Sequence, residues 1–251
     1  MKRYDGFLLC SDLDGTLTEN TLISDENIQA IKYFQENGGI FTVATGRMPE
    51  HITKSRYNDL FSGFMIALNG TIIYNLDSSG IVWDCCLDSD VAEVLEYVFE
   101  SYAFTDEVYF NGENNHLLAN KKNFRALLEN PIHTIVFCQN AKKTLLLKNE
   151  LRKKFGNRYK FEQSWPEGLE LYSMESGKGV CVEKTKELVS AHKTIHTTVC
   201  VGDFENDISM IKSADIGYAV GNATEDVKKA ADRVTVHYTE AAIAKIIYEI
   251  A

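Results

Sequence analysis

Two aspartates follow an apolar run near the beginning of the chain. Asp12 and Asp14 stand one residue apart after the run from Phe7 to Cys10, and Gly15 permits a sharp turn beside them. The run predicts a strand, and ligands of open α/β sheets lie at the carboxyl ends of strands. A carboxylate in that place can ligate a hard cation or act as a nucleophile. A solvated Asp-Gly turn would have the same composition, so this segment alone leaves both interpretations open.

Three further apolar runs end in groups of a similar kind: a hydroxyl, a guanidinium, an amide and another carboxylate. Because the carboxyl ends of parallel strands meet at one edge of a sheet, we expect all these groups to lie together with the first pair. Independent solvated turns would not all carry oxygen-rich or phosphate-binding groups. Glycines next to the hydroxyl and the last carboxylate would let backbone N–H groups approach an anion closely. The residues are Thr45, Gly46 and Arg47, then Asn69, then Gly202 and Asp203.

A lysine opens one of the predicted helices. Lys178 stands between Gly177 and Gly179, directly before a helical pattern over 180–189. The start of a helix offers free N–H groups and a favourable dipole, and a lysine there adds a point charge for an oxyanion. On its own, a lysine in a first turn is usually solvated. The segment is not a nucleotide-binding P-loop, because the pattern G-x-x-x-x-G-K-S/T does not occur in the chain.

Short apolar runs alternate with helical patterns in the first and the last part of the chain. That alternation predicts an α/β fold, in which a Rossmann-like parallel sheet is covered by helices. The strands are expected at 7–10, 40–44, 64–68, 198–201 and 216–220, and the helices at 25–36, 206–212 and 225–231.

The middle of the chain follows a different pattern. Between about 84 and 175, strands joined by a hairpin alternate with helices, which is typical of an α+β domain. We therefore expect a discontinuous catalytic core at 1–82 and 176–251, with an α+β cap inserted at 83–175. The expected elements of the insert are helices at 90–102 and 141–155 and strands at 108–110, 116–119, 134–138, 159–163 and 169–173.

Composition excludes some classes of function. The formal net charge of −10 and the sequence pI near 5.1 argue against a nucleic-acid partner, because phosphate backbones are bound mainly by clustered Lys and Arg. The six cysteines include no C-x-x-C pair and are expected to be buried free thiols. No apolar stretch approaches the length of a signal h-region or a membrane span, so we expect a cytoplasmic protein without a membrane partner.

Four segments, taken in chain order, resemble the four motifs of the haloacid dehalogenase-like (HAD) phosphatase superfamily. The position of the insert, between the second and third motifs, resembles the type II cap arrangement, and its α+β pattern resembles the Cof-like IIB branch. The run that begins at Gly221 and ends at Asp232 is also similar to that branch. The four segments are Asp12-Leu-Asp14-Gly-Thr-Leu, Thr45-Gly-Arg47, Lys178, and Gly202-Asp203-Phe-Glu-Asn206-Asp207.

The resemblance implies a role for each of these residues. Asp12 would attack phosphorus, and Asp14 would protonate the leaving oxygen and then activate water. Mg²⁺ would be held by Asp12, the backbone carbonyl of Asp14, and Asp203. The phosphate-binding residues would be Thr45, Gly46, Lys178 and Asn206, the substrate-binding residues Arg47 and Asn69, and the supporting residue Asp207, which with Asn206 orients its neighbours.

These roles imply an Mg²⁺-dependent phosphatase that hydrolyses a small phosphorylated metabolite, a sugar phosphate or similar, through a phospho-aspartate. One alternative is a phosphomutase of the phosphomannomutase type, which would need cap arginines for a second phosphate. The insert contains only Arg125, Arg152 and Arg158, with no recognisable motif, which favours hydrolysis. Another alternative is a non-catalytic sugar-phosphate-binding regulator, which would not require competent residues in all four motifs. The sequence does not indicate the substrate or the oligomeric state.

Overall fold

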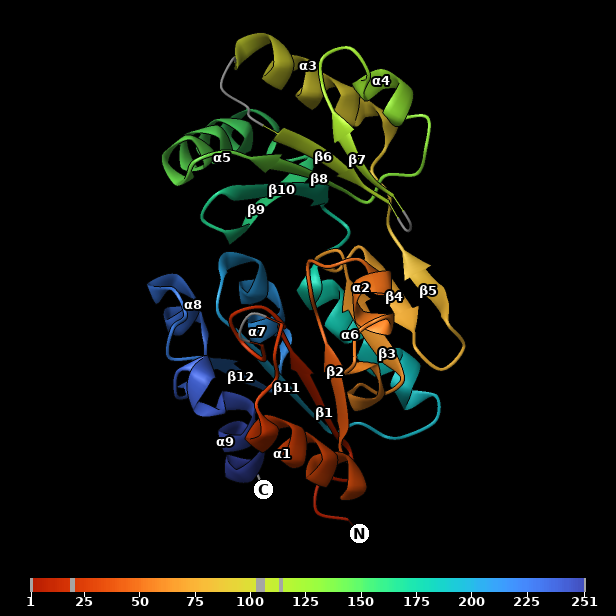
Figure 1. Ribbon diagram of the computed structural model, residues 1–251, viewed down its shortest axis with the longest axis vertical. Helices are drawn as coiled ribbons and strands as arrows, with labels where there is room; N and C mark the ends of the chain where they lie inside the picture. The colour runs from red at the N-terminus through yellow and green to blue at the C-terminus, as the bar shows by residue number, and fades with distance from the viewer. Residues whose placement is uncertain (1, 19–20, 103–106, 113–114, 251) are drawn as a thin grey trace. The chain divides into compact units, whose positions relative to one another are not determined.

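The computed structural model describes residues 2–18, 21–102, 107–112 and 115–250. The chain forms two compact units, one of Met1–Trp83 with Lys178–Ala251 and the other of Asp84–Gly177. The first unit is made from both ends of the chain, whereas the second is one uninterrupted stretch (Figure 1). Each unit has its own hydrophobic core. Within the described ranges, no helix has both the length and the apolar character that crossing a membrane requires.

A parallel sheet forms the centre of the first unit, as predicted. Its strand order is β13-β12-β11-β1-β2, so β1 pairs with β11 on one side and β2 on the other. Both faces of β1 are covered, which explains why its sequence is a continuous apolar run and not an alternating one. The strands are β1 (Phe7–Ser11), β2 (Ile40–Val43), β11 (Thr197–Gly202), β12 (Ile216–Ala219) and β13 (Arg233–Val234).

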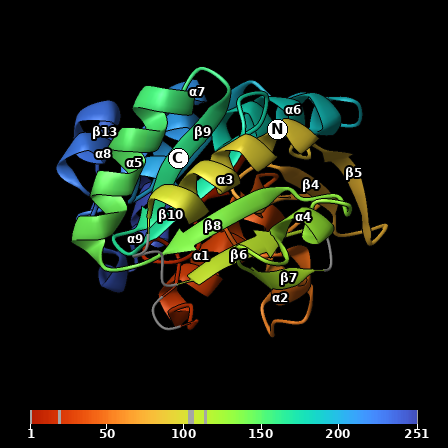
Figure 2. The ribbon, with the colours of Figure 1, turned by 90° about the horizontal axis from the view of Figure 1, so that it is seen from above.

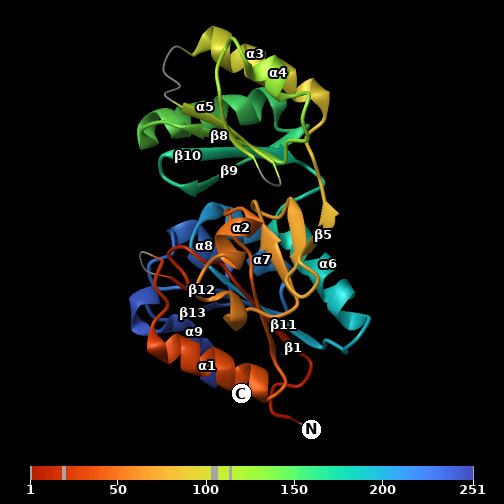
Figure 3. The ribbon, with the colours of Figure 1, turned by 45° about the vertical axis from the view of Figure 1, so that its right-hand side comes forward.

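Helices pack on the two faces of this sheet. Successive side chains of a strand point to opposite faces, and Leu9 accordingly joins the core of α1 (Asp25–Glu36) and α9 (Ala242–Glu249), whereas Cys10 packs with α6 (Lys178–Ser190). Figure 3 shows α1 and α9 on one side of the strands and α6 on the other. Three short helices complete the unit: α2 (Pro49–Thr53), α7 (Ile208–Ser213) and α8 (Glu225–Ala230).

The strand expected at 64–68 does not continue the parallel sheet. Instead, β3 (Phe64–Ala67) pairs antiparallel with β4 (Ile72–Asn75) in a separate sheet, β3-β4-β5, that ends with β5 (Gly80–Asp84). The chain reverses because Leu68, Asn69 and Gly70 all adopt positive φ, at 45°, 54° and 83°. A single parallel bridge, from Ala44 to Ile66, still joins β3 to the end of β2. The end of β3 therefore stays beside the edge where the site was predicted.

The second unit is α+β, with an antiparallel sheet of order β7-β6-β8-β10-β9. Its helices share one apolar core with the sheet, to which α3 contributes Leu95, α5 contributes Leu151 and β8 contributes Ile135. Figure 2 shows this unit from above. The elements are α3 (Ala92–Ser101), β6 (Glu107–Asn111), β7 (His116–Ala119), α4 (Phe124–Leu127), β8 (Thr134–Cys138), α5 (Ala141–Phe155), β9 (Tyr159–Trp165) and β10 (Gly168–Ser173).

Candidate active site

Asp12 and Lys178 meet at the carboxyl end of the parallel sheet. Asp12 follows β1, and its backbone N–H donates to the carbonyl of Val201 on β11 at 2.9 Å. Lys178 is the first residue of α6 and is completely buried. Its Nζ lies 2.6 Å from Oδ1 of Asp12 and 2.7 Å from Oδ1 of Asp207. Since a buried ammonium is costly unless paired, the two carboxylates account for its position.

The loop after β11 holds Asp203 and Asp207. Oδ2 of Asp207 accepts from the backbone N–H groups of Asp203, at 2.9 Å, and Phe204, at 3.1 Å. Gly202 makes this possible, because a Cβ there would lie 2.4 Å from the Cβ of Asp207. One oxygen of Asp207 therefore fixes the loop while the other accepts from Lys178. The sequence indicated only a supporting role for Asp207, and nothing in the motif pointed to its ion pair with the lysine.

Asp203 is held against the turn that follows Asp12. The hydroxyl of Thr16 donates to Oδ1 of Asp203 at 3.0 Å. Gly15 adopts φ +79°, and a Cβ on it would lie 2.8 Å from Oδ2 of Asp203. Glycine is required at this position both for the left-handed backbone and for the close approach of the carboxylate.

The electrostatics of this cluster indicate a cation site. Asp12, Asp203 and Asp207 each offer a carboxylate oxygen, and these oxygens all lie within 4.8 Å of one another. Burial and the charge of Asp207 raise the pKa of Asp12 well above its ordinary value, and the same two causes raise the pKa of Asp203 to about 7. Burial disfavours the charged form of Lys178, but Asp12 and Asp207 outweigh it and raise the lysine's pKa. Three carboxylates against one ammonium fit a hard divalent cation such as Mg²⁺, which prefers oxygen ligands.

Asp14 is more exposed than the carboxylates of the cluster and is paired with Arg47. The Nε of Arg47 donates to one carboxylate oxygen at 2.8 Å, and its Nη2 donates to the other at 2.5 Å. The Asp14 side chain is 55% exposed. Arg47 also lines a hollow of about 570 Å³ together with residues of α2 and Lys54. The sequence did not indicate this bidentate ion pair between two predicted site residues.

Thr45, Gly46, Asn69 and Asn206 form a second group at the same edge. The Thr45 hydroxyl accepts from the N–H of Arg47 at 3.1 Å, and the N–H of Asn69 donates to the Thr45 carbonyl at 2.9 Å. A Cβ on Gly46 would lie 3.3 Å from the Asn69 amide. Nδ2 of Asn206 donates to Oδ1 of Asn69 at 2.9 Å, so Asn206 orients Asn69. The predicted contact between Asn206 and a substrate phosphate stays a prediction.

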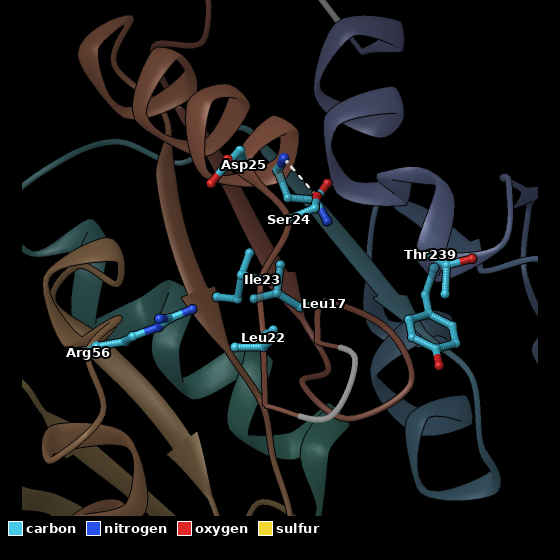
Figure 4. A pocket seen from close by; sticks show the side chains of 9 residues that line it. Leu17, Leu22, Ile23, Ser24, Asp25, Arg56 and Thr239 are labelled. Atoms are coloured by element: carbon cyan, nitrogen blue, oxygen red, sulfur yellow. Dashed lines mark hydrogen bonds between the residues drawn. The ribbon is translucent and has the colours of Figure 1, made fainter.

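A separate hollow of about 480 Å³ lies beside the start of α1 (Figure 4). Apolar side chains from Leu17, Leu22 and Ile23 lie near the polar Asp25 and Arg56 in its lining. The described residues that line it include none of the predicted site residues.

The family model of the haloacid dehalogenase-like hydrolases matches residues 9–247 of the chain. The chain belongs to this family. The match spans both parts of the first unit and the whole of the second. It confirms the family that the four motifs predicted.

Relatives within the HAD family include named phosphatases. The 5-amino-6-(5-phospho-D-ribitylamino)uracil phosphatase YcsE of Bacillus subtilis is 29% identical over an alignment of 258 positions, gaps included. The alignment covers 96% of this chain and 94% of that protein. A solved haloacid dehalogenase-like hydrolase from Bacteroides thetaiotaomicron is 27% identical, with a TM-score of 0.75 over 97% of this chain and 99% of the other. A HAD subclass IIB sugar phosphatase, 20% identical, shares the fold with a TM-score of 0.80 over 97% and 99% of the two chains. The chain is thus a phosphatase with the predicted IIB fold.

Proposed function

We propose that this HAD phosphatase requires Mg²⁺ and hydrolyses a small phosphorylated metabolite, a sugar phosphate or similar, through a phospho-aspartate on Asp12. The observation that supports this most strongly is the convergence of Asp12, Asp203 and Asp207 around the buried ammonium of Lys178. Phosphoryl transfer depends mainly on positioning and on neutralising charge, and this cluster provides both.

Asp12 is the nucleophile in this proposal. One carboxylate oxygen is held by Lys178, which fixes the orientation of the group and leaves the other oxygen to attack phosphorus. As the new O–P bond forms, the bond from phosphorus to the leaving oxygen breaks, and Asp14 gives that oxygen a proton. Asp14 then takes a proton from water, which attacks the phospho-aspartate and releases inorganic phosphate and free Asp12. Mg²⁺, held by Asp12, Asp203 and the backbone carbonyl of Asp14, would supply a Lewis acid that neutralises charge on the phosphoryl oxygens.

The ion pair between Asp14 and Arg47 must open, and the freed Asp14 carboxylate must take a proton from solvent, before Asp14 can act as an acid. A substrate phosphate is a competing bidentate partner for the guanidinium, since arginine binds phosphate and carboxylate with the same fork of donors. We infer that substrate binding itself draws Arg47 away from Asp14. Thr45 and Lys178 would hold the phosphoryl oxygens, with Gly46 giving backbone access, and Asn69 would contact the substrate beyond its phosphate.

The second unit is proposed to select the substrate, as the cap of this branch would. Two of its arginines are engaged in surface ion pairs: Arg158 lies 2.6 Å from both Asp90 and Glu93, and Arg125 pairs with Glu96. These pairs favour hydrolysis over a phosphomutase reaction, which would need arginines for a second phosphate.

Chemical trapping tests the proposal. The enzyme is mixed with substrate and Mg²⁺, quenched, and reduced with borohydride, which converts an aspartyl phosphate to homoserine. Homoserine at position 12, found by peptide mass spectrometry, is the expected result, and its absence at that position under turnover would overturn the assignment. In steady state, we expect Asp12→Asn to lower kcat by roughly 10⁴-fold or more, as loss of a nucleophile does in other covalent hydrolases. Asp77→Asn, an exposed change in the same unit, should leave kcat unchanged.

A substrate panel completes the test. Phosphorylated sugars, nucleotides and cofactors are ranked by kcat/KM with Mg²⁺, and the substrate named for the B. subtilis relative belongs in the panel. Full activity after exhaustive chelation with EDTA would exclude the metal requirement. Tight binding of a sugar phosphate without turnover would instead indicate the non-catalytic regulator.

A further inference from the structure

A second group of possible metal ligands lies in the other unit and shares no residue with the carboxylate cluster. Asp84, Cys86 and His133 all belong to the unit of Asp84–Gly177. Nε2 of His133 lies 3.0 Å from Oδ2 of Asp84 and 3.5 Å from Sγ of Cys86, and the same Sγ lies 3.5 Å from the same Oδ2. One sulfur, one nitrogen and one oxygen thus form a closed triangle.

The sides of this triangle match the spacing of ligands around a tetrahedral zinc ion. Zinc binds thiolate sulfur at about 2.3 Å, imidazole nitrogen at about 2.0–2.1 Å and carboxylate oxygen at about 2.0–2.2 Å. With tetrahedral angles, those lengths place sulfur about 3.6 Å from nitrogen and from oxygen, and nitrogen about 3.4 Å from oxygen. The observed sides of 3.5, 3.5 and 3.0 Å require only a small outward movement of the Asp84 carboxylate. That side chain can move because it is 46% exposed.

The arrangement does not fit a hydrogen-bonded nucleophilic triad. In such a triad the two ring nitrogens of histidine have different partners, one facing the nucleophile and the other facing the carboxylate. Here Nε2 of His133 faces both Cys86 and Asp84. Nδ1 is buried and has no hydrogen-bond partner among the residues that the structure describes. All three donor atoms therefore converge on one point, as ligands of an ion do.

The backbone holds the segments of these ligands together. The N–H of Leu87 donates to the carbonyl of Ile132 at 2.8 Å, so the residues that follow Cys86 and precede His133 are already paired. His133 is almost completely buried, which fixes its ring, whereas Cys86 is partly exposed and accessible to an ion. The His133 ligand is thus fixed before an ion binds, and the Cys86 ligand is open to an ion from solvent.

We propose that Asp84, Cys86 and His133 form a binding site for Zn²⁺ or a divalent transition metal of the same class, with a fourth position open to water. Thiolate and imidazole ligands select such ions over Mg²⁺, which prefers oxygen. The ion would tie the first residues of the second unit to the strand β8 that begins next to His133. This site is independent of the Mg²⁺ site proposed above, because no ligand is shared.

Cobalt spectroscopy of the full-length protein tests the site. Co²⁺ is added to reduced protein in the presence of excess Mg²⁺. A thiolate-to-cobalt charge-transfer band in the near ultraviolet, together with intense visible bands of tetrahedral Co²⁺, is the expected result. Cobalt bound only to carboxylates would give neither. Stoichiometric Zn²⁺ should abolish the spectrum, because zinc binds such ligands more tightly than cobalt does.

Two variants test the sulfur and nitrogen ligands, and a third variant is their control. Cys86→Ser and His133→Gln should lose the charge-transfer band, and Cys138→Ser, a matched change of another partly buried thiol in the same unit, should keep it. Zn²⁺ should also raise the Tm of the wild type but not of Cys86→Ser. Absence of the band in the wild type, or its persistence in Cys86→Ser, would overturn the proposal. Phosphatase activity with Mg²⁺ should be retained in Cys86→Ser, so failure of this site is distinguishable from failure of the catalytic assignment.

Discussion

Lys178 is fully buried and charged because Asp12 and Asp207 both accept from its ammonium. The lysine also lies at the N-terminus of α6, where the dipole disfavours a cation, so the two carboxylates must outweigh both burial and the dipole. The same dipole would favour a phosphoryl group bound there. The start of α6 therefore suits a bound anion, although a lysine at this position does not stabilise the helix.

Replacement of Lys178 should therefore destabilise the fold. In the metal-free protein we expect Lys178→Met to lower the free energy of unfolding by about 3–5 kcal/mol, because it leaves two buried carboxylates unpaired. Lys186→Met on the same helix removes a half-exposed pair with Asp215 and should cost less than about 1 kcal/mol. Urea denaturation in EDTA measures both. Equal losses of unfolding free energy in the two variants would mean that the buried ion pairs of Lys178 stabilise the fold no more than the surface pair of Lys186 does.

Asp14 offers a test of acid catalysis. An alkoxide leaving group needs a proton, whereas the phenolate of p-nitrophenyl phosphate needs it far less. Asp14→Asn should therefore slow the burst of Asp12 phosphorylation more for alkyl than for aryl phosphates, by at most ~10²–10⁴-fold. Hydrolysis of the phospho-enzyme should be slowed for both classes. Rapid-quench kinetics resolves the two steps, and equal slowing of the burst for alkyl and aryl substrates would remove Asp14 from the acid role.

The short loop between β11 and α7 fixes the positions of Asp203 and Asp207. Its geometry depends on Gly202, where the backbone of the strand approaches the Asp207 side chain too closely for any Cβ. In this geometry the Asp207 carboxylate accepts from two loop N–H groups and from Lys178 at once.

Gly202→Ala should disturb this loop. The added methyl group must displace Asp207, so we expect destabilisation by about 1–3 kcal/mol and a large loss of kcat. Gly80→Ala in β5 is the matched control, because a Cβ there meets nothing within 4 Å, and it should change neither quantity by much. Thermal unfolding and steady-state kinetics provide the two measurements. Normal activity in Gly202→Ala would show that Asp207 is not needed where the structure places it.

The positions of the parallel strands β1, β2, β11 and β12 and the residues at their ends were predictable, because hydrophobic runs and the residues after them are local signals. The hairpin of β3 and β4 was missed, although Asn69-Gly70 is a common hairpin sequence, because the amide was interpreted as the end of a parallel strand. The helix α9 and the strand β5 were also not predicted. The pairs Asp14–Arg47 and Lys178–Asp207 could not be predicted, since they depend on side-chain positions across loops distant in sequence.

For the whole molecule, the carboxylate cluster makes stability depend on pH and on metal. Burial and Asp207 raise the pKa of Asp203 from 3.8 to about 7 in the folded, metal-free state. The contribution of this group is fully present below pH 3.8 and is lost as pH rises through about 7, because the folded state holds the extra proton. The chelated protein should therefore lose stability between pH 5 and pH 8 from this group.

Mg²⁺ should reverse that loss, since it binds the ionised carboxylates. We expect the increase of Tm on adding Mg²⁺ to be larger at about pH 8 than at about pH 5.5, where protons compete with the ion. Asp203→Asn should show a smaller increase with a weaker dependence on pH, because Asp12, whose pKa is also raised, still competes for protons. Differential scanning calorimetry with EDTA or Mg²⁺ makes the comparison, and an increase as large at the lower pH would contradict it.

The pairing of β1 with β11 also determines the order in which the protein can fold on the ribosome. β1 is synthesised before the second unit, but its neighbour β11 and the helix α9 that covers the core of α1 come after the entire second unit. The second unit, as one uninterrupted stretch, can complete its own core while β1 still has an unpaired edge and α1 an uncovered apolar face. The nascent first unit is thus the part that needs protection from aggregation, and the Asp12–Lys178 contact can form only after the whole second unit has been synthesised.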